Sequence, residues 1–349
     1  MPSDFPVIEG AYLRDILDQP RALEETLAGL KVSETLRRLV TRLQEGTFKT
    51  VVLTGMGSSF HALHPFNIEL INRGFAPIMV ETSELLHYQS RLFDAKTLIV
   101  AVSQSGQSAE IVRMLEMNRG MSSVIAVTNT HDSPLAEQAD ATILSHAGPE
   151  FSVSCKTYLT ALMVLQWLGD LVCERDLRQT REEFEAASPG VLDYLAHWKE
   201  HVQNFAQMLE GTRHLFLVGR GPSLAAVGTG ALTVKESDHF HAEGMSSAAF
   251  RHGPLEMLSD EIFVLIFSGE PETRELNQRL CEDVRKAGGR AELVGVGATS
   301  QSCSLPSGPR AVHPILEMLP VQMVTLALAA RMGREAGRFE LASKVTTRE

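Results

Sequence analysis

Short, mostly apolar runs alternate with amphipathic helical stretches along most of this chain, and this alternation constrains the fold more than any other feature. In the first half the apolar runs occupy residues 49–55, 76–81, 97–103, 123–129 and 141–146. Strands that are apolar along their whole length, rather than at every second residue, are covered on both faces of a sheet. Strands that are separated by helices pair in parallel. The pattern therefore predicts an α/β fold in which a parallel β-sheet is sandwiched between helices.

The same layout then starts again. The segment HLFLVGRGPSLAAVGTGALTVKE at 214–236 repeats the order of features in VVLTGMGSSFHALHPFNIELIN at 51–72: a strand, a Gly-x-Gly turn, a serine and an amphipathic helix. Apolar runs at 261–269 and 291–297 continue the second copy. The sequence thus predicts an internal duplication with a period of about 160 residues.

We expect three segments from this organisation: an N-terminal stretch over 1–34, a first α/β domain over 35–180 and a second over 181–349. A long helix is expected near 155–174, followed by an exposed, charged helix. Ser188-Pro189-Gly190 is expected to act as a hinge, because proline and glycine interrupt helices.

Composition excludes several classes of protein. The 349 residues are 44% hydrophobic and 21% charged, which is typical of a globular protein. A formal net charge of −11 argues against a broad surface for nucleic acid or anionic membrane. The N-terminus has neither the basic nor the apolar region of a signal peptide. The most apolar helical stretch, 157–172, contains Gln166 and Asp170 and is too short to span a membrane. We therefore expect a cytoplasmic protein.

The cysteines show no CxxC pair and no metal-ligand spacing, which indicates free thiols. They are Cys155, Cys173, Cys281 and Cys303.

A hydroxyl-rich loop follows one of the buried strands. In AVSQSGQSAE, residues 101–110, polar side chains crowd between a strand and a helix, and the candidate ligand contacts among them are Ser103, Gln104, Ser105 and Ser108. Ligands of parallel sheets bind beyond the carboxyl ends of the strands, and the free N–H groups at a helix start favour an anion. The alternative is that these serines only cap the helix and form the turn.

A second hydroxyl pair, Ser58 and Ser59, follows the Gly-x-Gly turn of the first strand. The segment GMGSSF lacks the third glycine of a dinucleotide fingerprint, and no Walker lysine follows it. These departures argue against a nucleotide and favour a compact phosphate monoester as the ligand.

Ionisable residues crowd into KESDHFHAEGMSSAAFRHGPLE, residues 235–256. His252, in a turn before Gly253-Pro254, suits acid–base catalysis. If 239–243 were a strand, its two histidines and Glu243 would share a face and offer zinc ligands, but no further ligand has suitable spacing and we expect no metal site. A buried core histidine is the competing interpretation of His241.

Two further positions have open interpretations. Arg220, between two glycines of the second copy, is either a surface turn residue or a contact for an anion. Lys344 in the tail RFELASKVTTRE is either a solvated charge or part of a docked segment, because Leu341 and Val345 are apolar.

Together, SQSGQS, GMGSS, the repeated strand–helix layout and KESDHFHAEGMSSAAFRHGPLE resemble the tandem sugar-isomerase (SIS) domain family. The resemblance covers about residues 35–349 and is greatest to the isomerase half of glucosamine-6-phosphate synthase and to its stand-alone relatives of the deaminase and deglycase type. It implies two tandem SIS domains, each a parallel sheet between helices in the flavodoxin-like αβα arrangement.

The resemblance also implies roles for individual residues. The sugar phosphate is held by the serine loop with help from the Ser58-Ser59 pair, and Val153 and Cys155 lie near the sugar hydroxyls. Glu236 moves a proton between C1 and C2 of the sugar. His252 opens the ring and comes from the partner subunit, so a homodimer is implied. Lys344 matches the tail lysine that forms an imine with the open-chain sugar. No cofactor is expected.

Three departures from the synthase pattern bear on the reaction. No glutaminase domain precedes the first SIS copy, which leads us to expect no glutamine hydrolysis. Thr233 stands where the family has a lysine three residues before the proton-shuttling glutamate. The tail has LASKVT in place of LAKSVT, so Lys344 is shifted by one position.

These features lead to one main functional hypothesis and two alternatives. The main hypothesis is an isomerase and deaminase that converts glucosamine 6-phosphate to fructose 6-phosphate and ammonia. The alternatives are a fructosamine-phosphate deglycase and a non-catalytic sugar-phosphate sensor. The sugar's stereochemistry at C4, the amine substituent and any allosteric ligand are left open.

Overall fold

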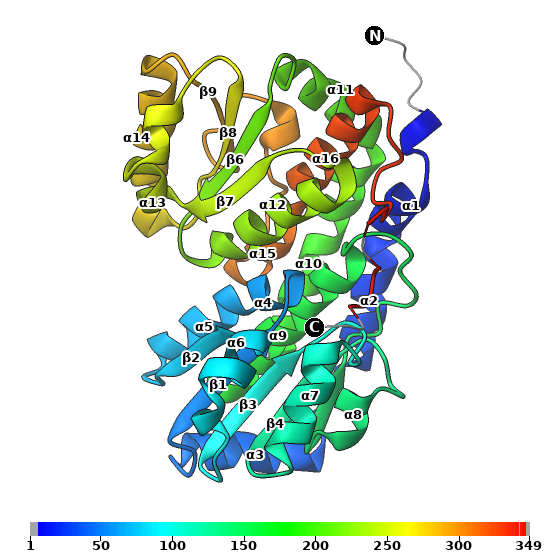
Figure 1. Cartoon of the computed structure of the whole chain (residues 1–349), viewed down its shortest axis with the longest axis vertical. Coiled ribbons are helices and arrows are strands. Elements are labelled where there is room, and N and C mark those ends of the chain that lie inside the picture. The colour runs from blue at the N-terminus through cyan, green and yellow to red at the C-terminus, as the bar shows by residue number, and fades with distance from the viewer. Residues whose placement is uncertain (1–5, 342, 347–349) are drawn as a thin grey trace. The chain divides into compact units, whose positions relative to one another are not determined.

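The computed structural model describes residues 6–341 and 343–346, and the chain forms two compact units (Figure 1). The first unit is made of residues 21–150, 156–185 and the described residues from 341 onward. The second is made of residues 6–20 together with 151–155 and 186–340. Neither unit is one contiguous stretch, unlike the segments 1–34, 35–180 and 181–349 expected from the sequence.

The first unit is built on a five-stranded sheet in the order β2-β1-β3-β4-β5, in which every pair is parallel. The strands are β1 (Thr50–Gly55), β2 (Pro77–Glu81), β3 (Thr97–Val102), β4 (Ser123–Thr128) and β5 (Ala141–Leu144). Its main helices are α3 (Glu34–Gln44), α4 (Ser58–His61), α5 (Leu63–Asn72), α6 (Thr82–Tyr88), α7 (Ala109–Asn118), α8 (Pro134–Gln138) and α9 (Lys156–Val172), with most of α2 (Gln19–Gly29) before them.

The apolar strands of this sheet are buried on both faces, as their composition predicts. β3 is buried at all six positions. On one face Ile99 packs in a cluster with Leu85 of α6 and with Ile111 and Leu115 of α7. The central strands are therefore fixed by burial.

The second unit holds a four-stranded parallel sheet in the order β7-β6-β8-β9. Its strands are β6 (His214–Gly219), β7 (Ala242–Ser246), β8 (Ile262–Phe267) and β9 (Arg290–Val294). Its main helices are α1 (Ala11–Leu17), α11 (Trp198–Met208), α12 (Leu224–Asp238), α13 (Ser247–Arg251), α14 (Pro271–Lys286), α15 (His313–Leu316) and α16 (Met318–Met332).

Successive residues of β6 face opposite sides of this second sheet and meet different helices. Phe216 packs with Leu280 of α14. A Cβ on Gly230 of α12 would lie 2.7 Å from Leu217 and 2.9 Å from Val321 of α16, so α12 packs tightly on the other face. The predicted layering of helices on both sides of each sheet is confirmed.

The two sheets confirm the predicted duplication. The order β2-β1-β3-β4 in the first sheet matches β7-β6-β8-β9 in the second. Thr50 and His214, the first residues of β1 and β6, are 164 positions apart, and Thr97 and Ile262, which begin β3 and β8, are 165 apart. The sequence pattern missed β7, which is short and contains Gly244.

The predicted hinge at Ser188-Pro189-Gly190 is wrong. Helix α10 runs without interruption from Leu177 to Ala196 and contains Pro189. Ala187, Val191 and Tyr194, spaced by four and three residues, are all buried, so an apolar stripe continues past the proline. Burial of this stripe outweighs the backbone hydrogen bond that proline removes.

Two features bear on the protein's surroundings. Within the described residues, one helical stretch, 310–332, is long and apolar enough to cross a membrane, but 89% of its apolar window is buried inside the protein. That burial is typical of a core helix. The four cysteines are buried free thiols.

Candidate functional site

The serine loop, residues 103–108, lies at the carboxyl end of β3 and leads into α7, as the sequence predicts. Two of its hydroxyls fold the loop on itself. Ser103 Oγ accepts a hydrogen bond from the N–H of Gly106 at 3.1 Å, and Ser105 Oγ accepts one from Gln107 at 3.3 Å. Ser108 is the N-cap residue of α7, but its side chain makes no capping hydrogen bond. Its hydroxyl therefore does not serve the helix cap.

The loop is braced from the side of β4. The carbonyl of Gln104 accepts hydrogen bonds from the N–H of Asn129 at 3.1 Å and from Thr128 Oγ1 at 3.3 Å. Gly106 has φ +62°, and a Cβ there would lie 2.2 Å from Ser133 Oγ. Glycine is thus required both by the left-handed backbone and by the close approach of Ser133.

Ser58 and Ser59 begin the short helix α4, directly after β1. Because β1 pairs with β3, this turn and the serine loop follow adjacent strands of one sheet. A Cβ on Gly55 would lie 3.0 Å from both the carbonyl oxygen of Val102 and the backbone of Ser59. The structure thus brings the Ser58-Ser59 pair and the serine loop to the same edge of the sheet, as predicted from the sequence.

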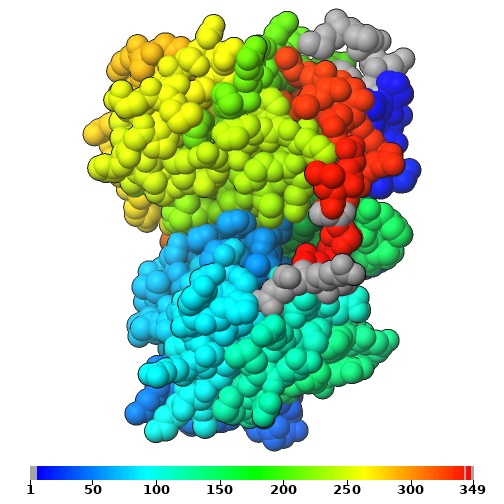
Figure 2. Space-filling view, in the orientation of Figure 1, coloured from blue at the N-terminus to red at the C-terminus, as the bar shows by residue number. Residues whose placement is uncertain are grey.

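The tail is docked on the first unit. The N–H of Ala109, the first residue of α7, donates to the carbonyl oxygen of Thr346 at 3.0 Å. Lys344 Nζ forms an ion pair with Glu150 Oε2 at 2.8 Å. The space-filling view has the tail at the molecular surface (Figure 2), where Leu341 is exposed. The tail is therefore docked, as one interpretation predicted, but through Lys344 and Thr346. The expected apolar contact of Leu341 is wrong, because that side chain is exposed.

The carboxylate of Glu150 in this ion pair is fixed by burial and by further hydrogen bonds. Its side chain is 0% exposed, whereas that of Lys344 is 24% exposed. The N–H of Thr157 donates to Glu150 Oε1 at 3.0 Å, and Thr157 Oγ1 donates to Oε2 at 2.7 Å. Such partners stabilise a buried carboxylate. The ion pair therefore holds Lys344, and with it the tail segment that is docked beside α7.

In the second unit, Glu236 lies half-buried near the end of α12. Its neighbour Ser237 accepts a hydrogen bond at Oγ from the N–H of Gly337 at 2.7 Å. The carbonyl of Gly337 accepts in turn from the N–H of Val153 at 3.1 Å. Gly337 therefore connects the segments of Glu236 and Val153, two residues that the resemblance assigns to one site.

Cys155 and His252, the other predicted residues of this unit, differ in exposure. Cys155 is buried, and its Sγ accepts a hydrogen bond from Gln19 Nε2 at 3.0 Å. His252 is exposed at the C-terminal end of α13, before Gly253 with φ +142°. The prediction that His252 lies in a turn is confirmed; its role stays a prediction.

The premise of the zinc alternative is wrong. His239 and His241 precede β7, and His239 ends α12 in a left-handed conformation. Arg334 contacts His239 Nε2 at 3.3 Å, whereas His241 Nδ1 contacts His214 at 3.1 Å. Among the residues described, no group of three or more His, Cys, Asp or Glu side chains is arranged to hold a metal.

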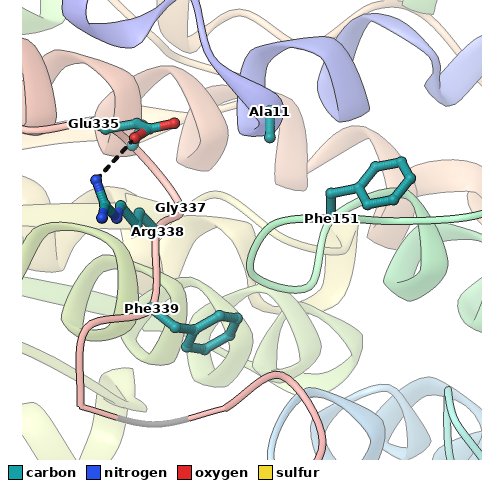
Figure 3. A pocket seen from close by; sticks show the side chains of 7 residues that line it. Ala11, Phe151, Glu335, Gly337, Arg338 and Phe339 are labelled. Carbon is teal, nitrogen blue, oxygen red and sulfur yellow. Dashed lines mark ion pairs between the residues drawn. The ribbon is translucent and has the colours of Figure 1, made fainter.

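A pocket of 270 Å³ lies in the second unit (Figure 3). Its lining comes from α1, the segment around Phe151 and the segment 335–339. Phe151 is exposed, and Arg338 is 3.6 Å from Glu335, the pair joined by the dashed line. Gly337, which bonds to the neighbour of Glu236, also lines this pocket.

Sequence reasoning missed Glu150, Thr157 and Gly337. The first two lie in HAGPEFSVSCKT, residues 146–157, the segment that also holds Val153 and Cys155, yet nothing in their spacing pairs them with a lysine almost two hundred residues later, at position 344. A Cβ on Gly337 would lie 2.7 Å from Tyr12, a contact that only the folded chain reveals.

Comparison with known proteins agrees with this geometry. The model of the family described as "SIS domain" matches residues 48–169 and 208–302. The glutamine–fructose-6-phosphate aminotransferase (isomerizing) of Pyrococcus horikoshii is 29% identical over 352 residues, covering 97% of this chain and 58% of that protein. The chain thus spans somewhat more than half of this curated relative.

Two solved structures share the fold. The C-terminal domain of the glucosamine-fructose-6-phosphate aminotransferase from Francisella tularensis gives a TM-score of 0.81 at 20% identity, over 95% of this chain and 98% of that one. The glucosamine-6-phosphate deaminase of Thermotoga maritima gives 0.75 at 17% identity, over 97% and 100%. The two sheets, their matching strand orders and both matched segments lead to one conclusion: this chain belongs to the SIS domain family, with two SIS-like domains in tandem.

Proposed function

We propose that this chain is a phosphosugar isomerase that acts on an amino-hexose 6-phosphate. In the reaction, glucosamine 6-phosphate and water give fructose 6-phosphate and ammonia. One observation carries the proposal: the serine loop joins the start of α7 at a strand end, beside the Ser58-Ser59 turn and the docked tail. The names of the relatives, which concern fructose 6-phosphate and glucosamine 6-phosphate, support this choice of substrate.

In this proposal the phosphate is the handle of the substrate. Hydroxyls and backbone N–H groups at the start of α7 bind it, remote from the reacting carbons. Binding energy from the phosphate can then hold the open-chain sugar in position for proton transfer. The phosphate contacts are assigned to Ser58, Ser59, Ser103, Gln104, Ser105 and Ser108.

The acid–base steps are assigned to the second unit and the tail. His252 opens the ring, and Glu236 moves the proton between C1 and C2. Lys344 forms the imine only after it leaves Glu150, because imine formation requires a free electron pair on Nζ. The proton shift from C2 to C1 turns C2, which carries the amino group, into an imine carbon. Attack of Lys344 Nζ on C2 then expels ammonia and forms the lysine imine, and water hydrolyses that imine to fructose 6-phosphate and free Lys344.

The first test is ammonia release from glucosamine 6-phosphate, with fructose 6-phosphate measured in the same sample and no glutamine present. Equal amounts of both products support the proposal. Replacing Glu236 by Gln should reduce turnover by roughly 100-fold or more while phosphosugar binding is retained. If the protein binds phosphosugars without any turnover, and Glu236→Gln changes nothing, the sensor alternative replaces the enzyme.

A second candidate, fructosamine-phosphate deglycase, is favoured by the pocket of Figure 3. This pocket shares Gly337 with the segment of Glu236 and carries Arg338, a partner for the carboxylate of an amino-acid substituent. Three results together would establish this candidate in place of the first. The protein turns over a fructosamine 6-phosphate, the Arg338→Ala substitution slows that turnover, and glucosamine 6-phosphate does not react.

A further inference from the structure

Three loops meet at the carboxyl end of the second sheet, where the duplication predicts the counterpart of the serine loop. A Cβ on Gly219, the last residue of β6, would lie 3.1 Å from the side chain of Ser223 and 3.3 Å from Phe267 at the end of β8. The N–H of Val296, after β9, donates to Ser268 Oγ at 3.0 Å. The ends of β6, β8 and β9 therefore converge.

This edge has lost the serine loop. Six residues, 103–108, join β3 to α7, but only three, Ser268, Gly269 and Glu270, join β8 to α14. The shorter loop ends in a carboxylate at the N-cap position of α14. The edge therefore cannot bind a phosphate in the way proposed for the first sheet.

A buried carboxyl group completes the convergence. Glu317 is 3% exposed, and its Oε1 accepts a hydrogen bond from Ser223 Oγ at 2.7 Å. Its Oε2 has no hydrogen-bond partner among the described residues. Burial, with a contribution from the nearby charge of Glu270, raises the pKa of Glu317 to about 8, so the group is a neutral O–H donor at pH 7.

The neighbouring loops supply guanidinium groups. Arg220 follows β6 within the turn that contains Ser223, and Arg274 lies in the first turns of α14. The Nε atom of each is buried and has no acceptor in the part of the chain that the structure describes. Buried polar atoms without partners are uncommon in proteins and call for an explanation.

The charge of the cluster favours an anion. Arg310 forms an ion pair with Glu270. Among the described residues, no carboxylate forms an ion pair with Arg220 or Arg274, so the charges of these two side chains are uncompensated. Burial, with Arg274 and Arg310 nearby, lowers the pKa of His313, which favours its neutral imidazole. Guanidinium groups bind phosphate through paired N–H donors.

An acceptor lies in the same place. Asn277 is fully buried, and its Nδ2 donates to the carbonyl oxygens of Phe267 and Ser268 at 2.9 and 3.3 Å. Its Oδ1 lacks a donor among the described residues. A Cβ on Gly269 would lie 3.5 Å from Asn277 Nδ2 and 3.6 Å from Ser223 Oγ. The amide of Asn277 therefore lies near Ser223, which is the hydrogen-bond partner of Glu317. An acceptor three residues after Arg274 on α14 suits a ligand that carries hydroxyls as well as negative charge.

We propose that the carboxyl edge of the second sheet is a separate binding site for a small hydroxylated phosphate ester, held by Arg220, Arg274, Asn277 and Glu317. The site is distinct from the serine loop and goes beyond the proposed reaction. A ligand bound there acts as a regulator or a stabiliser of the second unit, not as the substrate.

The test uses inorganic phosphate and glycerol 3-phosphate as probes on the full chain, with binding measured by equilibrium dialysis. The Ser103→Ala/Ser105→Ala variant weakens the serine loop and isolates the second site. In that background, Arg274→Ala is expected to weaken binding about tenfold or more. The matched control is Arg279→Ala, on the same helix, whose guanidinium is exposed and paired with Glu275.

Thermal melting of each variant separates a lost contact from a lost fold, and Arg274→Lys should retain part of the affinity because it keeps the charge. The proposal is overturned if the serine-loop variant binds neither probe, or if Arg274→Ala binds both as tightly as Arg279→Ala does. Absence of ammonia release from glucosamine 6-phosphate would contradict the proposed function alone and leave this second site untouched.

Discussion

At the scale of single residues, Glu317 makes stability depend on pH. Its pKa is raised to about 8 in the folded chain, first by burial, and returns to its ordinary value near 4.5 on unfolding. Between these values the folded state holds a proton that the unfolded state has lost. Stability therefore falls as pH rises from about 4.5 to about 8, by at most about 1.4 kcal/mol per pH unit, and the loss is complete above pH 8.

Glu317→Gln should remove this part of the pH dependence, because the amide is neutral throughout and still accepts from Ser223. Urea unfolding at several pH values measures it. The exposed Glu275→Gln on α14 serves as the control. Parallel stability curves for wild type and Glu317→Gln between pH 5 and 8 would show that the carboxyl is not held protonated.

Gly106 offers a second test at this scale. Gly106→Ala should cost about 1–2 kcal/mol for the left-handed backbone and a further 1–3 kcal/mol for the clash with Ser133, and it should weaken phosphosugar binding. Gly120→Ala is a matched control, because Gly120 has φ +74° and nothing within 4 Å of an added Cβ. Thermal melting and ligand titration of both variants measure the loss of stability and of phosphosugar affinity. Equal losses of stability in the two variants would mean that Ser133 moves aside.

At the scale of elements, the tail and α7 are coupled through Lys344. Lys344→Met should release the tail and expose the N–H of Ala109, which donates to Thr346. Hydrogen exchange at the N–H of Ala109 is expected to accelerate about tenfold, because the free energy that holds the tail in place falls by the contribution of a partly buried ion pair. The N–H of Val112, which donates to Ser108 within the same helix, is an internal control and should exchange as before. Unchanged protection of Ala109 would show that other contacts hold the tail.

At the scale of the whole molecule, we expect a homodimer in which each active site takes His252 from the partner subunit. Its exposure at the end of α13 is compatible with that role. Mixing Glu236→Gln and His252→Ala chains, each inactive alone, should restore up to about a quarter of the wild-type activity if subunits exchange at random. Mixed dimers that bind ligand but stay inactive would contradict the shared site.

How far the sequence predicts this molecule depends on whether a feature is encoded locally. Apolar runs between helices predicted both sheets, and the strand–turn–serine order placed Ser58 and Ser105 at adjacent strand ends. The hinge at Pro189 failed because tertiary burial of Val191 and Tyr194 outweighs a local helix-breaking signal. The partnership of Glu150 with Lys344 was beyond reach, since it joins residues that are 194 positions apart and only the fold brings them together.

The hydrogen bond between Ala109 and Thr346 has a consequence for biosynthesis. Every strand of both sheets precedes Thr346 in the chain, and the residues that bond to Gln104 and Gly106 lie close to them in sequence. During translation the serine loop can therefore reach its folded shape early, because domains fold as they emerge from the ribosome. The contact that covers the start of α7 forms only after the second sheet has been synthesised, which makes closure of the loop by the tail one of the last steps of folding.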